Sequence, residues 1–239
     1  MLQNIRRFYG KEIGACDGAI GHVRDFYFDD RTWAVRYLIA DTGTWLTGRL
    51  VLLSPHAFGR FDQDEPIVSA NLTRSQIEKA PSIDSHLSVS RQYEEAYYRH
   101  YGWPVYWKGG QLWGMDSFPA LVPPPIQEPR EEKASEKRAD AHLRSTRAVT
   151  GYSIHAVDGL IGEVTDFLLD PRTWAIRELV VEAGHWYSGR EIRIPPGKVD
   201  RISFEDSSVF VSLTKEDIQR TGEDEDARAG GATHVAGRS

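Results

Sequence analysis

Two matched pairs of aspartates are the residues best suited to chemistry. Asp25 recurs as Asp166 and Asp29 as Asp170, in each case 141 positions later. A pair of carboxylates could exchange protons as general acid and base, or bind a divalent cation. The alternative is structural, because aspartates at strand ends accept hydrogen bonds from backbone or arginine N–H groups, and turn chemistry alone explains Asp29 and Asp170. Nothing nearby supplies a nucleophile, so we favour the structural interpretation.

The remaining polar residues form no catalytic or metal-binding pattern. No two histidines have the His-x-x-x-His spacing of a helical zinc site. The single cysteine, Cys16, matches Val157, which predicts a small buried apolar position. The glycines Gly18 and Gly21 fit a turn and a bend in β structure, and no P-loop, nucleophile elbow or dinucleotide fingerprint is present. We therefore expect no cofactor and no metal, and we predict that the protein is not an enzyme.

The elements that must position these residues occur twice. Residues 13–79 (the first copy) recur without a gap at 154–220 (the second copy), with 26 of 67 aligned pairs identical. The shared pattern is Asp-Gly-x-Ile-Gly-x-Val-x-Asp-Phe, followed by Asp-x-Arg-Thr-Trp-Ala-x-Arg. The period is far longer than the roughly 20–50 residues of solenoid repeats. It indicates two copies of one small domain.

Each copy predicts a series of short strands and then a helix. In the first copy, β-rich stretches alternate with turn residues over 13–16, 20–29, 33–40, 44–53 and 67–72. Thr73 with Gln76 forms a capping box ahead of Ile77, and Thr214 with Asp217 is its weaker counterpart. Five or six short strands indicate a small, strongly bent sheet or barrel. The predicted fold class is mainly β: two small β-barrels, each followed by a short helix.

The repeated tryptophans admit two interpretations. Trp33 matches Trp174, and Trp45 matches Trp186. Tryptophan is enriched in the hot spots of protein interfaces, but it also packs across neighbouring strands. Because both copies keep both tryptophans, we favour packing.

The doubled motif resembles the PRC-barrel family. The resemblance covers residues 5–80 and 146–221. It implies a small β-barrel like the cytoplasmic domain of the photosynthetic reaction centre H subunit and the C-terminal domain of the bacterial ribosome-maturation factor. The known roles of that family are binding and assembly. The resemblance therefore implies an interaction module of a bacterial protein and no particular reaction.

Different sequence separates and follows the two copies. We expect domains at 1–81 and 141–222, a connector and linker at 82–140, and a disordered acidic, then Gly/Ala-rich tail at 223–239. The aromatic part of the connector is one candidate interaction surface, using rigid aromatic contact area. Its members are Tyr97, Tyr98, Tyr101, Trp103, Tyr106 and Trp107. The alternative is that this segment packs back on one or both barrels, because so aromatic a stretch should not remain in water.

Composition narrows the class of partner. A net charge of −6 argues against direct nucleic-acid binding, which needs clustered basic residues. The apolar runs are far shorter than the roughly 20 residues of a membrane-spanning helix, and no signal-peptide pattern is present. We expect a cytoplasmic protein with a protein partner, associated peripherally with a membrane complex at the inner face of the cell membrane. An adaptor that binds a ribosomal protein, a hydrolase using Asp25 or Asp166, and a homo-oligomer are the alternatives left open.

Overall fold

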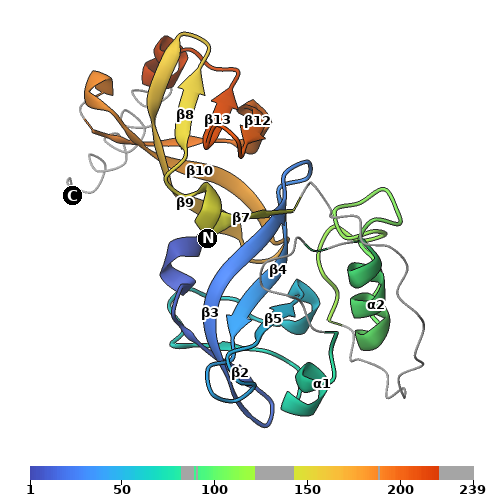
Figure 1. The fold of residues 1–239 in the computed structure, drawn as a ribbon. Coiled ribbons are helices and arrows are strands. Elements are labelled where there is room, and N and C mark those ends of the chain that lie inside the picture. The colour runs from blue at the N-terminus through green and yellow to red at the C-terminus, as the bar shows by residue number, and fades with distance from the viewer. Residues whose placement is uncertain (82–88, 90, 122–142, 188, 221–239) are drawn as a thin grey trace, which may run out of the picture. The chain divides into compact units, whose positions relative to one another are not determined.

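The structure is a computed structural model that describes residues 1–81, 89, 91–121, 143–187 and 189–220 (Figure 1). Most of the expected proline-rich and charged linker, and the whole expected tail at 223–239, lie outside the described residues. The described chain is mainly β, with a curled sheet, as the sequence predicted. No helix in the described ranges is long and apolar enough to cross a membrane.

Strands, α-helices and 3₁₀ turns make up the described part of the chain. The strands are β1 Gln3–Asn4, β2 Glu12–Ala15, β3 Gly18–Asp29, β4 Ala34–Asp41, β5 Leu50–Leu53, β6 Ile67–Ser69, β7 Leu143–Ser145, β8 Ser153–Ala156, β9 Gly159–Asp170, β10 Ala175–Ala183, β11 Glu191–Ile194, β12 Val199–Ser203 and β13 Ser208–Val211. The α-helices are α1 Arg74–Glu78, α2 Arg91–Tyr101 and α3 Thr146–Val149, and residues 215–220 are also helical. The 3₁₀ turns are η1 Ile5–Phe8, η2 Pro55–Ala57, η3 His185–Tyr187 and η4 Pro196–Lys198.

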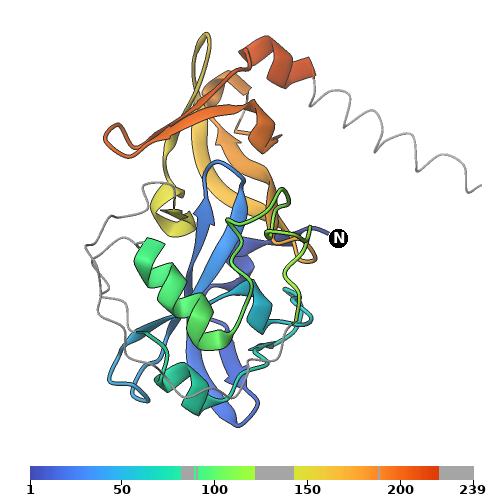
Figure 2. The ribbon, with the colours of Figure 1, turned by 90° about the vertical axis from the view of Figure 1, so that its right-hand side faces the viewer.

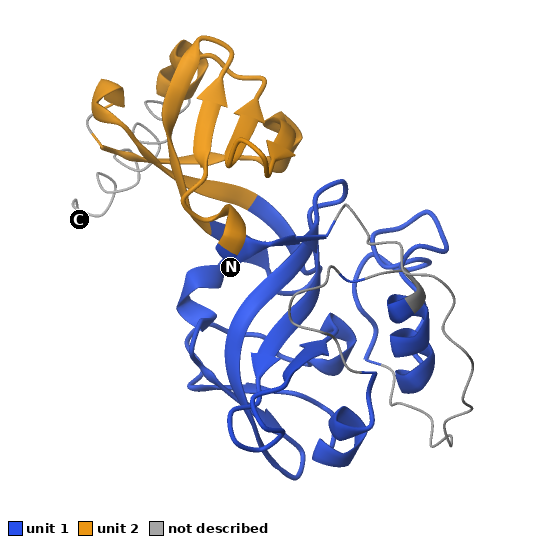
Figure 3. Ribbon diagram, viewed as in Figure 1, with its two compact units in different colours: residues 1–147, 167–177 blue, residues 148–166, 178–239 orange. Residues whose placement is uncertain are grey.

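The chain forms two compact units that do not follow the boundaries of the repeat. The first unit is Met1–Arg147 with Phe167–Arg177, and the second is Ala148–Asp166 with Glu178–Ser239 (Figure 3). The described part of the connector, up to residue 121, therefore belongs to the first unit. So does 167–177, the end of a hairpin that belongs to the second copy by sequence.

The same strand pairing occurs in both copies. In the first unit, β2 pairs antiparallel with β3 and parallel with β6, and Ile13 lies opposite Gly21. In the second unit, β8 pairs antiparallel with β9 and parallel with β13, and Ile154 lies opposite Gly162. The register shift that follows this pair is also repeated. The sequence repeat is thus a repeat of strand register.

The repeated glycine of the motif is explained by a close backbone approach. A Cβ on Gly21 would lie 1.9 Å from the carbonyl oxygen of Asp41, and one on Gly162 would lie 2.0 Å from that of Glu182. Heavy atoms cannot approach so closely, so each hairpin needs glycine at this position.

The repeated Asp-Gly turn also holds the helix that ends each copy. The side chain of Asp17 accepts a hydrogen bond from the backbone N–H of Arg74 (2.7 Å), at the start of α1. Asp158 accepts in the same way from Lys215 (3.1 Å). Each aspartate satisfies a backbone donor that the first turn of a helix leaves free.

Both predicted helix caps are confirmed. Thr73 and Gln76 exchange side-chain and backbone hydrogen bonds as a capping box. Thr214 and Asp217 do the same, at 3.0 and 3.1 Å.

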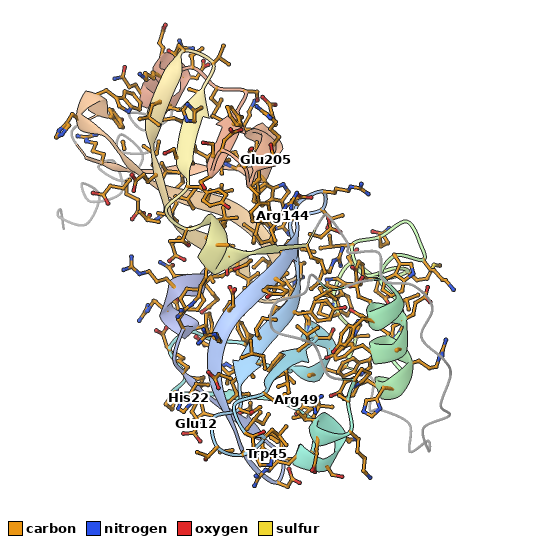
Figure 4. The ribbon with its side chains drawn as sticks, in the orientation of Figure 1. Glu12, His22, Trp45, Arg49, Arg144 and Glu205 are labelled. Atoms are coloured by element: carbon orange, nitrogen blue, oxygen red, sulfur yellow. The ribbon has the colours of Figure 1, made fainter. Side chains whose placement is uncertain are left out.

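The strand ahead of each copy pairs with the hairpin of the other copy, which the sequence did not predict. Within the first unit, β1 pairs with β9, and Gln3 lies opposite Leu169. In the same unit β7 pairs with β3, and Arg144 lies opposite Phe28. These two pairs differ by the 141-residue offset of the repeat. Arg144 also forms an ion pair with Asp30 of the first copy, at 2.6 Å (Figure 4).

The first pair of repeated tryptophans packs in the core of the first unit. Trp33 stacks on Phe28 at 5.3 Å between ring centroids. Trp174 lies against Phe58 at 5.5 Å and against Phe61 at 4.3 Å. The packing interpretation is confirmed for this pair.

The second pair of tryptophans is half-buried, and each ring is covered by a cation. The guanidinium of Arg74 lies 4.5 Å from the ring of Trp45 (Figure 4), and the ammonium of Lys215 lies 5.5 Å from the ring of Trp186. The indole N–H of Trp186 also donates to the carbonyl of Ile161. Trp45 and Trp186 therefore attach the helix that ends each copy to the β structure of that copy.

Candidate functional site

A hollow of about 460 Å³ lies in the first unit. It is lined by Arg24, Asp25, Tyr27, Ile39, Asp41, Gly48, Leu50 and Arg147. Ile39 is buried, whereas Arg24 and Arg147 are exposed. Arg24 lies 3.7 Å from the carboxylate of Asp41, and Arg147 lies over the ring of Tyr9. Asp25, one of the two sequence-predicted acids of the first copy, is part of this lining.

Asp25 has its carboxylate oxygens occupied by donors of the protein. Oδ1 accepts from the backbone N–H of Phe26 (2.7 Å), the backbone N–H of Arg147 (3.1 Å) and the hydroxyl of Thr146 (3.1 Å). Oδ2 accepts from the hydroxyl of Ser145. Burial raises the pKa of Asp25, while these hydrogen bonds oppose that rise. The arrangement holds the start of α3 against β3, in agreement with the structural interpretation.

The turn aspartates also have the hydrogen bonds that turn chemistry predicts. Asp29 accepts from the backbone N–H of Arg31 at 2.9 Å, and Asp170 accepts from that of Arg172 at 3.0 Å. Burial acts to raise the pKa of Asp170, but hydrogen bonds from Thr173, Arg172 and the guanidinium of Arg177 outweigh it, so the pKa lies below its usual value. Asp166 is buried in the second unit.

The aromatic connector lies on the first copy, where α2 is placed on one side of β4 and β5 (Figures 1 and 2). Of the six residues in the candidate interaction surface, Trp107 is half-buried and the others are buried. The buried ones are Tyr97, Tyr98, Tyr101, Trp103 and Tyr106. These five form no exposed docking surface. The five residues instead pack on the first copy of the repeat, which was the alternative interpretation. This packing explains why β4 is buried on both faces.

A buried acid at the centre of this contact was missed by the sequence analysis. The carboxylate oxygen Oε1 of Glu94, on α2, accepts hydrogen bonds from the hydroxyls of Tyr37 (2.7 Å) and Tyr106 (2.8 Å). Nearby, the hydroxyl of Tyr97 donates to the carbonyl of Leu52 and accepts from the backbone N–H of Ser54. These bonds join the connector to β4 and β5.

A buried cation completes the contact. The guanidinium of Arg36, which is 2% exposed, lies 3.8 Å from the ring of Tyr106 and 4.9 Å from that of Trp113. It donates to the carbonyl of Leu112 at 2.8 Å and lies 3.8 Å from the carboxylate of Asp29. Cation–π attraction is strongest where water is excluded, as it is here.

Comparison of the copies gives a sequence signal for this covered face. Tyr37 and Leu52 in the first copy correspond to Glu178 and Arg193 in the second. Glu178 and Arg193 form an ion pair at 3.7 Å, and neither is buried. Apolar residues in one copy at positions that are charged in the other therefore marked the face that the connector covers.

His56, on η2, lies in a ring of aromatic side chains. Its imidazole stacks on Trp103 at 5.6 Å and meets Trp113 edge-on at 5.4 Å. Its Nδ1 lies 2.8 Å from the carbonyl oxygen of Ala120. Burial lowers the pKa of His56, and Arg36 lowers it further. The imidazole is therefore neutral near pH 7, with the proton on Nδ1.

The structure also bears on Cys16 and on clusters of possible metal ligands. Cys16 is exposed, so the prediction of a buried position was wrong. It lies in the turn that joins β2 to β3, and its counterpart Val157 is also exposed. Within the described ranges, no cluster of three or more His, Cys, Asp or Glu side chains could hold a metal ion.

Large apolar side chains are exposed on the last described part of the connector. The exposed fractions are 82% for Met115, 51% for Phe118 and 53% for Leu121. Between and beside them, Trp113 and Ala120 attach the segment to the first unit through hydrogen bonds to Thr173 and His56. The connector therefore does present apolar side chains, but they differ from those that the sequence suggested.

Comparison with known proteins identifies no family. No protein-family profile matches the chain. A protein of Deinococcus radiodurans, described only as uncharacterized, is 39% identical to this chain over 77 residues. The match covers 30% of this chain and 26% of that protein. The chain therefore spans about a quarter of the length of this relative.

Proposed function

We propose that the protein is a non-enzymatic interaction module built from two PRC-type β-barrels, each followed by a short helix. The doubled motif, the repeated strand register and the repeated aspartate contact to the helix support this architecture. The observation that carries the function is the exposure of Met115, Phe118 and Leu121 within seven residues of the connector.

Exposed apolar side chains gathered in one place are typical of sites where another protein binds. The segment that carries them is fixed at two points. The indole N–H of Trp113 donates to the carbonyl of Thr173 at 2.8 Å, and His56 is bonded to Ala120. A segment held in this way loses little conformational entropy when a partner binds, which favours affinity.

The partner of this module is a protein with an apolar groove. Burial of one large apolar side chain contributes about 1.5–3 kcal/mol, so three of them can supply most of a moderate affinity. A subunit of a membrane complex and a ribosomal protein both fit this description. The acidic balance of the chain favours a protein over a nucleic acid in either case.

The test is a comparison of co-purifying proteins by quantitative mass spectrometry. The full chain would be compared with the triple variant Met115→Ser, Phe118→Ser, Leu121→Ser. A matched control replaces three exposed apolar residues elsewhere, Ile67→Ser, Leu160→Ser and Phe204→Ser. We expect a partner that the wild type and the control retain and that the first variant loses by about tenfold or more. Retention by the first variant, or equal loss from both variants, would exclude this segment as the binding surface.

A further inference from the structure

His56 is one of the buried residues through which the first copy contacts the connector. Residues 103–121, here called the strap, run across the face that carries η2. Two strap side chains, Trp103 and Trp113, contact the imidazole. The carbonyl of Ala120 accepts a hydrogen bond from its Nδ1–H group. The ring is 2% exposed, so water does not reach it easily.

The second ring nitrogen of His56, Nε2, is buried and has no hydrogen-bond partner among the described residues. In the neutral imidazole this leaves one buried acceptor unpaired, at the cost of its desolvation. A second proton would instead place a cation there, with a donor that has no partner, and such a group is strongly disfavoured by burial.

The charged groups around the ring add to this effect. Arg36, on β4, lies over the ring of Trp113 that His56 also contacts, so a protonated His56 would place two cations against one indole. Asp116, on the strap, acts in the opposite direction. The acid on α2, Glu94, is bonded to Tyr37 and Tyr106.

The strap can leave without breaking the sheet. Its bridges, Gln111 with Gly114 and Trp113 with Asp116, lie within the strap itself. Its attachments include contacts between rings, the hydroxyl of Tyr106 donating to Glu94 on α2, and side-chain bonds to backbone carbonyls. These join Arg36 to Leu112, Trp113 to Thr173 and His56 to Ala120. Segments attached mainly through side chains are among the first to open in native proteins.

We infer that His56 is an acid-sensitive latch, whose protonation releases the strap from the first copy while the sheet remains folded. Release uncovers the aromatic face around Tyr37 and Tyr98 and frees Met115 and Phe118 from their fixed positions. The inference goes beyond the proposed function, since it concerns what governs the surface and not which partner binds there.

Hydrogen exchange measured by mass spectrometry on the full chain tests the latch. Exchange would be compared at about pH 7.5 and about pH 5, after correction for the intrinsic effect of pH on exchange. His56→Gln keeps a donor for Ala120 but does not titrate, and His22→Gln removes an exposed histidine of β3 as the matched control (Figure 4). We expect acid to lower the protection of 103–121 by about tenfold or more relative to β3 and β4, as for a segment that opens locally. The wild type and His22→Gln should show this loss, and His56→Gln should not.

Three results would overturn the inference. They are no selective loss of strap protection in the wild type, the same loss in His56→Gln, and joint loss of strap and sheet. If His56→Gln does not fold, an NMR titration of the wild-type protein still tests the latch. The titration of the His56 ring protons must then coincide with the loss of strap protection, and separate titrations would contradict the latch. Partner binding is not measured, so this outcome is independent of the proposed function.

Discussion

The backbone carbonyls of Trp33 and Trp174 each accept a hydrogen bond from the copy to which the other tryptophan belongs. The carbonyl of Trp33 accepts from the backbone N–H of Ile176 at 2.7 Å, and that of Trp174 accepts from Val35 at 2.8 Å. Both tryptophans have left-handed backbone conformations, with φ of 57° and 56°. For a residue other than glycine this costs about 1–2 kcal/mol. The shared hydrogen bonds and the burial of both rings offset that cost.

The reciprocal contact means that neither hairpin end is complete by itself. Ala34 pairs with Ala175, and the strand ahead of each copy pairs with the hairpin of the other. The repeated Arg-Thr-Trp-Ala motif therefore encodes a contact between the copies as well as a turn within each. This accounts for the assignment of residues 167–177 to the first unit.

Loss of the Trp174 side chain should be among the most destabilising single changes. Its ring is buried between Phe58 and Phe61, so Trp174→Ala should lower the free energy of unfolding by about 3–5 kcal/mol. The half-buried Trp186 is the control, and Trp186→Ala should cost about half as much or less. Chemical denaturation followed by circular dichroism measures both. Similar losses would show that the core of the first unit does not depend on Trp174.

Substitution by alanine should distinguish a glycine of the second unit that has no room for a Cβ from one that does. Gly162→Ala would place its Cβ 2.0 Å from the carbonyl oxygen of Glu182, so the backbone must shift, at a cost of about 1–3 kcal/mol. Gly197→Ala meets nothing within 4 Å and should change stability by less than about 0.5 kcal/mol. Thermal unfolding of both variants checks this. An unchanged Gly162→Ala would mean that the hairpin is looser than the structure shows.

The two tyrosines that share Glu94 should not contribute independently. Tyr37→Phe and Tyr106→Phe each remove one hydrogen bond to Oε1 and should each cost about 1–3 kcal/mol. In the double variant we expect a coupling energy of about 0.5 kcal/mol or more, because the carboxylate is a common partner. Tyr27→Phe, at the edge of the hollow, should have little effect. Strict additivity would argue against a shared buried network.

Substitution of Asp25 distinguishes a structural from a catalytic carboxylate. Asp25→Ala leaves the donors of Phe26, Thr146 and Arg147 without their acceptor and should cost about 2–3 kcal/mol. Asp25→Asn retains one oxygen acceptor and should cost less. Asp64→Ala, at an exposed ion pair with Arg7, should be close to neutral. Denaturation curves give the order. A fully stable Asp25→Ala would favour the hydrolase hypothesis over a structural role.

The stability of the protein should fall on mild acidification because of His56. Burial holds the pKa of His56 below its ordinary value of 6.5, which the unfolded chain retains. The stability that this difference contributes is therefore fully present above pH 6.5 and is lost as pH falls through the pKa of the folded state. His56→Gln should show a shallower loss over this range, and His22→Gln should follow the wild type. Urea denaturation at a series of pH values gives the slopes, and equal slopes for His56→Gln and the wild type would contradict the assignment.

Local patterns predicted what depends on local chemistry. Alternating apolar residues gave the mainly β class, Thr73 with Gln76 gave a helix cap, and the matched aspartates gave turns with the predicted acceptors. Each of these results depends on residues a few positions apart, for which backbone geometry leaves few choices. The 141-residue repeat was also evident, since a strand register is copied with its sequence.

Only the tertiary structure decided which surfaces are covered and which strands cross between the copies. β1 and β7 are too short to have a period, so nothing in Gln3–Asn4 or Leu143–Ser145 indicates their partners. The aromatic connector could have covered a copy of the repeat or bound a partner, because the hydrophobic effect drives burial of apolar surface without specifying its partner. Contacts between the copies, and the contacts of the buried Arg36 and the buried Glu94, depend on distances across the fold. These residues are far apart in the sequence and come into contact only when the chain folds, so local patterns cannot predict their contacts.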